Sequence, residues 1–259
     1  MAEAILSRAI AQNVTVAADV VVSEPVEARR AQLAQRHAVT VAASNRDAAR
    51  DASLVVLAVK PQHISHVYHD LGDQLSSAQT VLSIVAGVGI AKLSAGLNHP
   101  LIARAMPNTP AQVGAGVTVW TVSESVPAES RNVIASLLGS IGREIFVSDE
   151  VYLDMATAVS GSGPAYVFLF MEAMTEAGVH AGLPRDIAYS LVLDTVLGSA
   201  QLAKESGRHP GLLREMVTSP GGTTAEALRA LERGGFRSAL QEAVAAAHRK
   251  AQALGGGSA

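Results

Sequence analysis

Two glycine-rich stretches of the chain have the composition to bind a small polar ligand. The first, Ser160-Gly161-Ser162-Gly163-Pro164, lies between two segments whose apolar residues recur at helical spacing. Pro164 suits the first turn of a new helix, where a backbone N–H is not needed. The glycines allow the chain to turn and leave N–H groups free for a ligand. The pattern predicts a polar pocket at the N-terminus of a buried central helix.

The second stretch, Thr218–Thr224 (TSPGGTT), leads directly into a segment with helical periodicity. Glycines ahead of a helix leave N–H groups free, and the helix dipole adds partial positive charge, so the pattern suits an anion. The same residues also form ordinary capped turns. From the residues alone, both interpretations stay open.

Three predicted buried strands end in segments that suit a ligand site. These segments are Val59-Lys60-Pro61-Gln62, Ser83–Val88 and Arg104–Pro110. In an open α/β sheet, ligands bind at the carboxyl ends of the strands. Because three strand ends would point into one crevice, they form a stronger signal together than any one of them alone.

Three histidines, His63, His66 and His69, recur every third residue on a predicted helix. A spacing of three drifts around the helix, and Asp70 is the nearest carboxylate. A solvated helical face is the favoured interpretation, and no metal site is predicted.

The composition restricts the class of protein. The net charge is −3 over 259 residues, which argues against non-specific nucleic-acid binding. There are no cysteines, which fits a reducing compartment. No apolar run is long enough to cross a bilayer, and Met1–Ala11 lacks the pattern of a signal peptide. We therefore expect a soluble cytoplasmic protein with no membrane partner.

Hydrophobic periodicity divides the chain near Ser148. Before that point, predicted strands alternate with helices, which indicates an open, mostly parallel α/β sheet. The strands are expected at Val14–Val22 (interrupted at Ala17–Asp19), Val39–Ala42, Ser53–Val59, Thr80–Val85, Leu101–Ala105, Val117–Val122 and Glu144–Val147. The helices are expected at Ala2–Ala11, Val26–Arg36, Gln62–Leu71 and, capped by Asn45, in a short segment before Ser53.

After Ser148 only helices are predicted. They are expected at Glu150–Val159, Ala165–Ala181, Arg185–Ser206, His209–Val217, Thr224–Arg233 and Phe236–Leu254, followed by a frayed tail at Gly255–Ala259. The nearly unbroken apolar run Val167–Met171 must be covered by the same domain or by a partner chain. It predicts an obligate dimer through the helical domain.

Six motifs together resemble pyrroline-5-carboxylate reductase, and they follow the order of that family. They are AVKPQ, SIVAGV, RAMPNTPA, AVSGSGPAYVF, TSPGGTT and GGFRSAL, and the resemblance extends from Met1 to about Leu254. It implies a Rossmann-like dinucleotide-binding domain at residues 1–148 and an all-α substrate and dimerisation domain at 149–259. It also implies a homodimer or a larger ring of dimers, and the last step of proline biosynthesis. In that step, NADPH or NADH reduces 1-pyrroline-5-carboxylate to L-proline.

The resemblance also assigns roles to residues. Thr157 matches the hydroxyl near the ring nitrogen of the substrate and is the expected catalytic residue. The implied substrate-binding residues are Glu150, Ser162, Gly221, Gly222, Thr223 and Thr224. The implied cofactor-binding residues are Ser23, Asn45, Ala58, Val59, Lys60, Pro61, Ile84, Val85, Ala86, Met106, Pro107 and Asn108.

The start of the chain departs from the family pattern. Family members have a strand and a GxGxM-type loop before the helix at Ala2–Ala11, and here Met1 coincides with the last residue of that fingerprint. Without that strand, which normally lies mid-sheet, we expect a gap between its neighbours. A misassigned start is favoured over a true chain that binds the dinucleotide poorly.

Cofactor preference and function each keep an alternative. Glu24 favours NADH, because an acid at this position binds a free ribose hydroxyl, whereas Ser23 and Arg29-Arg30 favour NADPH. The alternatives to the reductase are a non-catalytic dimeric remnant or another imine or β-hydroxyacid dehydrogenase. The last places a catalytic lysine in its second domain, and this chain has no lysine between Lys92 and Lys204.

Overall fold

The computed structural model describes residues 1–256, which form two compact units. One unit is Met1–Ser162 together with the end of the chain from Ala247, and the other is Gly163–Ala246. None of the described helices is both long enough and apolar enough to span a membrane. The predicted division into functional domains at Ser148 stays a prediction, because these units reflect compactness alone.

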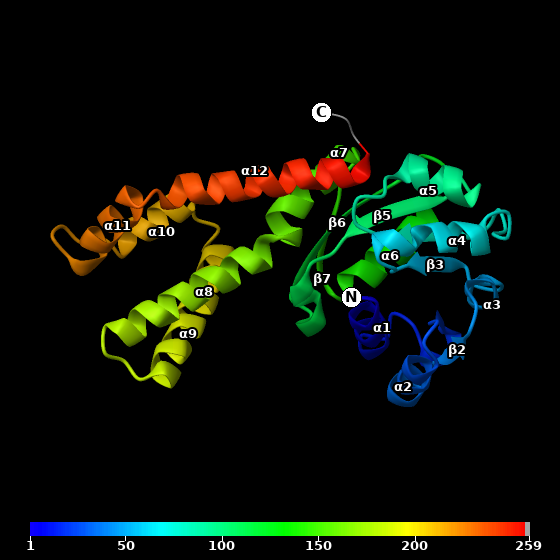
Figure 1. Cartoon of the computed structure of the whole chain (residues 1–259), viewed down its shortest axis with the longest axis horizontal. Helices are drawn as coiled ribbons and strands as arrows, with labels where there is room; N and C mark the ends of the chain where they lie inside the picture. Colours follow the sequence, from blue (N-terminus) through cyan, green and yellow to red (C-terminus); the bar gives the residue numbers. More distant parts are fainter. Residues whose placement is uncertain (257–259) are drawn as a thin grey trace. The chain divides into compact units, whose positions relative to one another are not determined.

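The first unit contains a five-stranded sheet in which neighbours in the sequence are also neighbours in space (Figure 1). Its order is β3 (Leu54–Leu57), β4 (Thr80–Ser83), β5 (Ile102–Met106), β6 (Gly116–Val122) and β7 (Gly142–Phe146). All pairs are parallel except β5 and β6. The predicted mostly parallel sheet is confirmed, with strands shorter than expected at β3 and β4.

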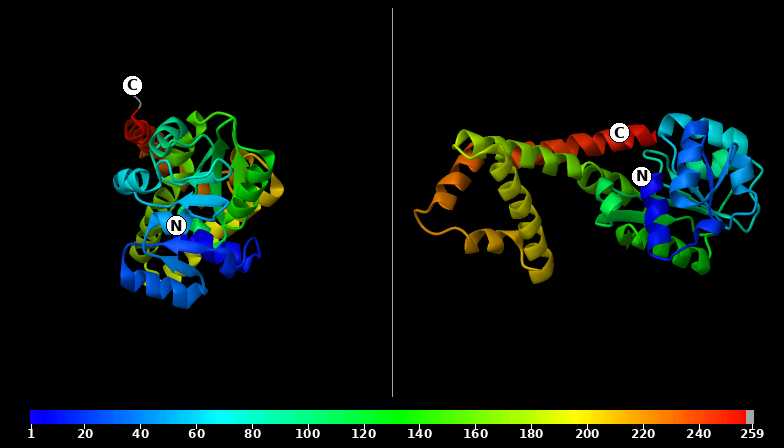
Figure 2. Two further views of the ribbon diagram at one scale, coloured as in Figure 1. Left: turned by 90° about the vertical axis from the view of Figure 1, so that its right-hand side faces the viewer. Right: turned by 90° about the horizontal axis from the view of Figure 1, so that it is seen from below.

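Helices cover both faces of this sheet (Figure 2). On β4, Val81 packs in one apolar cluster with Leu93 and Leu97, whereas Leu82 packs in another with Ile134 and Leu138. Side chains of successive strand residues point to opposite faces. The unbroken apolar sequence of β4 is therefore explained by burial on both sides.

The first unit contains the helices α1 (Ala2–Ala11), α2 (Glu27–His37), α3 (Asn45–Ala49), α4 (Ile64–Leu71), α5 (Ile90–Leu97), α6 (Ala128–Gly139) and α7 (Val151–Ala156). Two of these helices were not predicted from the sequence. The unpredicted ones are α5 and α6, although each buries two leucine or isoleucine side chains four residues apart. The prediction that Asn45 caps α3 is wrong, because Ser44 is the N-cap and its hydroxyl accepts the N–H of Asp47.

Two short strands, β1 (Val21–Ser23) and β2 (Thr40–Ala42), form a separate parallel sheet. The strand predicted over Val14–Val22 is confirmed only at Val21 and Val22, which pair with β2. The predicted interruption at Ala17–Asp19 is present as a 3₁₀ turn, and Val14–Val16 does not form a strand. A strand forms where a partner is available, and β2 offers only three residues.

The expected gap in the sheet is present among the described residues. β1 and β3 belong to different sheets, and the segment that carries β2 lies below β3 in Figure 1. Val21 is 42% exposed and Val56 is 37% exposed, although parallel strands covered on both faces are normally buried. Each sheet therefore ends in a strand with unpaired backbone groups.

The second unit is entirely helical, as predicted. It contains α8 (Gly163–His180), α9 (Arg185–Ser206), α10 (Pro210–Met216), α11 (Thr223–Arg233) and the first part of α12 (Phe236–Gly255), with α8 packed beside α9. The predicted tail starts inside α12 at Gly255, and residues 257–259 lie outside the described part of the chain.

A single chain does not bury the predicted central helix. On α8, Phe168 is 61% exposed and Leu169 is 66% exposed, and Thr175 is its only buried residue. The apolar run of this helix is therefore not covered by its own unit. The sequence allowed the apolar run to be buried either by its own domain or by a partner chain, and burial by a partner chain is the alternative that remains.

Candidate functional site

Three predicted cofactor segments lie at one edge of the five-stranded sheet. Ala58–Pro61 follows β3, Ile84–Ala86 follows β4, and Met106–Asn108 ends β5. The three strands are adjacent and parallel, so their carboxyl ends lie side by side. The structure therefore brings together the three strand ends that the sequence predicted to meet.

Internal hydrogen bonds fix two of these segments. The Ser83 hydroxyl accepts the N–H of Val85 at 3.2 Å, and the Asn108 side-chain oxygen accepts the N–H of Val117 at 2.9 Å. Pro107 and Asn108 are buried. The Asn108 side chain thus anchors the start of β6, and the segment can offer a ligand mainly its backbone.

The end of α12 covers the loop that follows β4, a contact that the sequence did not predict. Gly87 has a φ of +72°, and a methyl group placed on it would lie 2.6 Å from Leu254 Cβ. Glycine is therefore needed at this position both for its backbone conformation and for the close approach of the helix.

The residues predicted to contact the adenosine end lie apart from these strand ends in the sequence. Ser23 is the last residue of β1, and Asn45 is the first residue of α3, where its amide donates to Asp70 at 2.8 Å. The Arg30 guanidinium donates to the carbonyls of Glu24 and Pro25 at 2.7 and 2.9 Å.

Arg29 is directed to the opposite side, toward α1. Its guanidinium donates to Glu3 at 2.5 Å and to Gln32. Of the two arginines that the sequence placed near a 2′-phosphate, Arg29 is therefore already paired with an acid.

The expected tight break at Ser160–Pro164 is wrong. Thr157–Gly161 forms a π-helical turn that continues α7, closed by a hydrogen bond of 2.8 Å from the Ser162 N–H to the Thr157 carbonyl. Neither Gly161 nor Gly163 has a positive φ. Gly161 serves close packing here, since a methyl group on it would lie 3.1 Å from Met106 Cε, whereas a methyl group on Gly163 would meet no atom within 4 Å. Single π-turns of this kind occur often at functional sites.

Thr157, the predicted catalytic residue, lies at the start of this π-turn. Its hydroxyl donates to the Leu153 carbonyl at 2.7 Å. A hydroxyl has one donor and two acceptor lone pairs. With its proton committed to the backbone, the Thr157 oxygen can accept a hydrogen bond from a ligand.

Glu150, predicted as a substrate-binding acid, is held by two bonds to one of its oxygens. Oε1 accepts the N–H of Ile90 at 2.8 Å and the Arg104 guanidinium at 2.8 Å. Arg104 also donates to Asp154 at 2.9 Å. The Arg104 side chain is only 7% exposed. These contacts join β5, α7 and the N-terminus of α5.

Arg104 lies in the RAMPNTPA motif, but neither Arg104 nor Asp154 is assigned a role from the sequence. A signal was available in both cases. Arg104 lies within an apolar strand, where a buried charge requires a partner. Glu150 and Asp154 are four residues apart, which places them on one face of a helix.

The predicted substrate residues Gly221, Gly222, Thr223 and Thr224 lie in the second unit. Gly221 has a φ of +69°, and Gly222 is the N-cap of α11 with no side-chain cap bond. The 11-residue helix thus begins with N–H groups that no side chain satisfies, which is the arrangement expected of an anion site.

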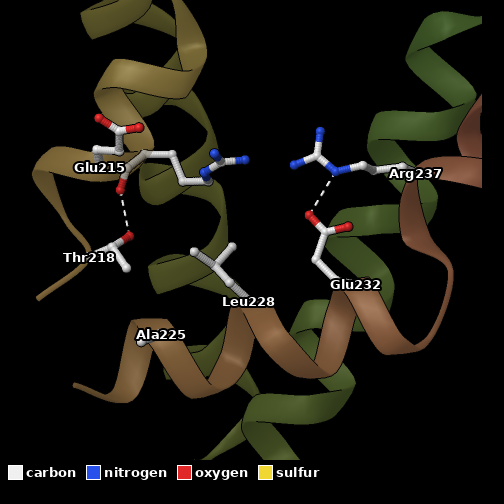
Figure 3. Close-up of a pocket in the computed structure, with 7 residues that line it drawn as sticks. Glu215, Thr218, Ala225, Leu228, Glu232 and Arg237 are labelled. Carbon is white, nitrogen blue, oxygen red and sulfur yellow. Dashed lines mark hydrogen bonds and ion pairs between the residues drawn. The ribbon is translucent and has the colours of Figure 1, made fainter. Parts of the chain in front are cut away.

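A pocket of about 350 Å³ lies in the second unit, beside this turn (Figure 3). Its charged side chains are Arg214, Glu215, Glu232 and Arg237, and Figure 3 shows Arg237 donating to Glu232, at 2.7 Å. Thr218, the first residue of the predicted anion-binding stretch, lines this pocket, but Gly221, Gly222, Thr223 and Thr224 do not. Its charges balance, so it has no clear preference for an anion.

Comparison with known proteins identifies the family. The model for the pyrroline-5-carboxylate reductase dimerisation domain matches residues 150–254, and the model for coenzyme F420-dependent NADP oxidoreductases matches residues 1–87. A pyrroline-5-carboxylate reductase from Synechocystis is 44% identical over 255 residues, which are 98% of this chain and 95% of the relative. The chain belongs to the pyrroline-5-carboxylate reductase family.

Solved structures of this reductase family have the same fold. A pyrroline-5-carboxylate reductase from Coxiella burnetii matches with a TM-score of 0.90 and 37% identity, covering 98% of this chain and 94% of that one. The enzyme from Plasmodium falciparum, crystallised with NADP bound, matches with a TM-score of 0.86 and 32% identity, covering 97% and 93%. The predicted fold class is therefore confirmed, and the dimerisation-domain match supports self-association of this reductase.

Family membership makes NAD(P)H the expected cofactor, and the residues at the sheet edge fit it. Side chains at the ends of β4 and β5 are small or uncharged, so a flat ring can approach the backbone there. The α1 helix has no side-chain cap at its N-terminus, and free N–H groups at such a position suit a phosphate. The match to the NADP oxidoreductase model covers α1 and the end of β4.

Proposed function

We propose that this protein reduces 1-pyrroline-5-carboxylate to L-proline with NADPH or NADH, the last step of proline biosynthesis. The observation that carries the proposal is the 44% identity to a pyrroline-5-carboxylate reductase over 98% of the chain. The bound cofactor supplies the hydride. The chain itself must orient the substrate and stabilise the change of charge on its ring nitrogen.

The cofactor site uses the sheet edge. The segments Ala58–Pro61, Ile84–Ala86 and Met106–Asn108 hold the nicotinamide and its ribose by their backbone groups, and Ser23 and Asn45 face the adenosine end. Adjacency of the three strand ends supports this assignment.

Thr157 binds the substrate nitrogen. The protonated imine is already electrophilic, so hydride adds to its carbon while the double-bond electrons move to nitrogen, and no strong acid is needed. Because the Thr157 proton is given to Leu153, its oxygen accepts the N–H of the substrate and orients the ring. Glu150 and Ser162, at either end of the same segment, contribute to the binding of the substrate.

The N-terminus of α11 binds the substrate carboxylate. Gly221, Gly222, Thr223 and Thr224 supply backbone N–H groups and hydroxyls, and the helix dipole favours the negative charge.

The functional unit is a homodimer or a ring of dimers. The substrate is the small-molecule partner, neither nucleic acid nor membrane is a partner, and location in the cytoplasm stays a prediction.

The experiment begins with cofactor binding and then measures turnover. NADPH and NADH are titrated while nicotinamide fluorescence is followed, and oxidation is then recorded with 1-pyrroline-5-carboxylate. For Thr157→Ala we expect kcat to fall by about tenfold or more. Thr157→Ser should retain most activity, since it keeps the hydroxyl. Thr224→Ala should mainly raise KM for the substrate.

The outcomes separate the proposal from its alternatives. A chain that changes no nicotinamide fluorescence is the non-catalytic remnant. A chain that binds NADPH but reduces a 3-oxoacid to the β-hydroxyacid, instead of reducing the imine, is the other dehydrogenase. Equal kinetics for wild type, Thr157→Ala and Thr224→Ala would remove both residue roles.

A further inference from the structure

We propose that Arg104 is a positioning residue that holds the Thr157 segment in place against the cofactor-binding edge of the sheet. This inference rests on the proposed function, because it is that function which gives Thr157 its role. Arg104 touches neither Thr157 nor any predicted cofactor segment through its guanidinium. It acts through Glu150, the N-cap residue of α7, and Asp154 within that helix.

The first observation is the shape of the network. One guanidinium nitrogen donates to Glu150 at 2.8 Å and the other to Asp154 at 2.9 Å. The two acids are one helical turn apart, so the planar fork of a single arginine spans a full turn of α7. Two bonds in a fixed fork constrain rotation of the helix as well as its distance from β5.

The second observation is burial. The Arg104 side chain is 7% exposed, while Glu150 and Asp154 are 32% and 22% exposed. Two carboxylates around one buried cation satisfy its charge. If the arginine is removed, two acids remain side by side without a cation, which repel each other and release α7.

The third observation is where these contacts lie in the chain. Asp154 precedes Thr157 by three residues. The π-turn that starts at Thr157 contains one residue more than an α-helical turn. Asp154 is the nearer to this turn of the two acids that Arg104 binds.

A second contact from β5 supports the same alignment. Arg104 and Met106 are two residues apart on β5, so their side chains project from one face of the strand. Met106 reaches Gly161 at the far end of the π-turn, where a methyl group would lie 3.1 Å from its Cε atom. Arg104 and Met106 thus bracket Thr157 from one strand, and Met106 also begins the cofactor segment that ends this strand.

Glu150 extends the network to a second cofactor segment. Its Oε1 atom accepts the N–H of Ile90, the first residue of α5, at 2.8 Å. Ile90 follows Ile84–Ala86 by four residues. The network thus links Thr157, which binds the substrate, to the ends of both β4 and β5, which bind the cofactor. Hydride transfer requires a fixed geometry between substrate and cofactor.

The test compares Arg104→Met and Arg104→Lys in the full chain, with Arg131→Met as a matched control. Arg131 is also partly buried in the first unit, but it donates only to the carbonyls of Val126 and Glu124. For Arg104→Met we expect kcat to fall by about tenfold or more, while KM for substrate and cofactor changes by less than about threefold. Arg104→Lys should recover part of kcat, because an ammonium group reaches one acid at a time. Arg131→Met should retain wild-type kcat.

Hydrogen exchange in the same variants supplies a readout that does not depend on turnover. In Arg104→Met, exchange should accelerate in the peptide containing Ile90 and in residues 150–162, and stay unchanged in α2 and α6. Acceleration throughout the first unit would mean that Arg104 serves stability alone, and unchanged kcat would mean that it does not position Thr157. Either result overturns the inference. If the wild-type chain itself does not reduce the imine, the proposed function fails, and the exchange pattern alone decides whether Arg104 holds the segment.

Discussion

The two compact units bury their large apolar side chains to different extents. In the first, leucines such as Leu82 and Leu138 are fully buried between sheet and helices. In the second, large apolar side chains on α8 and α9 are exposed to solvent, including Leu169 at 66% and Leu197 at 62%. The first unit completes its core within one chain, whereas the second requires another surface.

The same contrast holds for the predicted site residues. Those of the first unit are tied to distant parts of the sequence, as Glu150 is to Arg104 and Asn45 to Asp70. Those of the second unit form a turn held by near neighbours, such as the Gly222 N–H bonded to the Ser219 carbonyl. The comparison teaches that the first unit fixes these residues by long-range contacts within one chain, whereas the turn of the second unit depends on local contacts.

The largest expected effect comes from charging the exposed face of α8. Phe168→Glu combined with Leu169→Glu should abolish the dimer, because two carboxylates cannot be buried unpaired in an apolar interface. Turnover should fall by about a hundredfold or more if assembly completes the site. Light scattering after size-exclusion chromatography measures the mass. Val133→Glu, an exposed position on α6, is the control and should leave the dimer intact.

An intermediate effect is expected from truncating leucines in the two units. Leu82→Ala, in the fully buried β4, should lower the free energy of unfolding by about 3 kcal/mol. Leu191→Ala, at a position 54% exposed on α9, should cost less than about 0.5 kcal/mol in the monomeric α8 variant. Urea unfolding measures both. If Leu191→Ala were as costly as Leu82→Ala in the monomer, the second unit would not differ from the first in the way described.

The smallest effect concerns one ion pair in each unit. Hydrogen bonds from His37 and then Arg29 lower the pKa of Glu3 from 4.5 to about 2. Because the folded-state pKa is lowered, the ionised acid stabilises the fold above pH 4.5, and this contribution is lost as the pH falls toward 2. Glu3→Gln should therefore cost about 1 kcal/mol at neutral pH, since the pair is partly exposed to water, and progressively less below pH 4.5.

Glu176 in the second unit is the matched comparison. A hydrogen bond from Arg185 lowers the pKa of its carboxyl, but both side chains are about half exposed or more. Glu176→Gln should change the unfolding free energy less than Glu3→Gln does at neutral pH. Urea unfolding at pH 7 and pH 3 tests both variants, and a larger effect of Glu176→Gln would contradict the comparison.

The sequence predicted most elements because local pattern and tertiary environment agree in them. The helices at Ala2–Ala11 and Arg185–Ser206 have the predicted bounds. Where the two disagree, prediction failed. Val14–Val16 has strand-forming residues but forms no strand. Ser160–Pro164 has turn-forming residues, but its start belongs to a π-helical turn in which Gly161 lies close to Met106.

For the site, residue types and motif order alone determined the family, the cofactor class and the three strand ends that meet, because parallel strands must bring their carboxyl ends to one edge. Only the tertiary structure decided that Glu150 is paired with Arg104, that Leu254 covers Gly87, and that α8 stays exposed in one chain. The physical reason is distance along the chain. Local spacing fixes which face of an element is apolar or charged, but the partner that meets that face is set by how the whole chain packs.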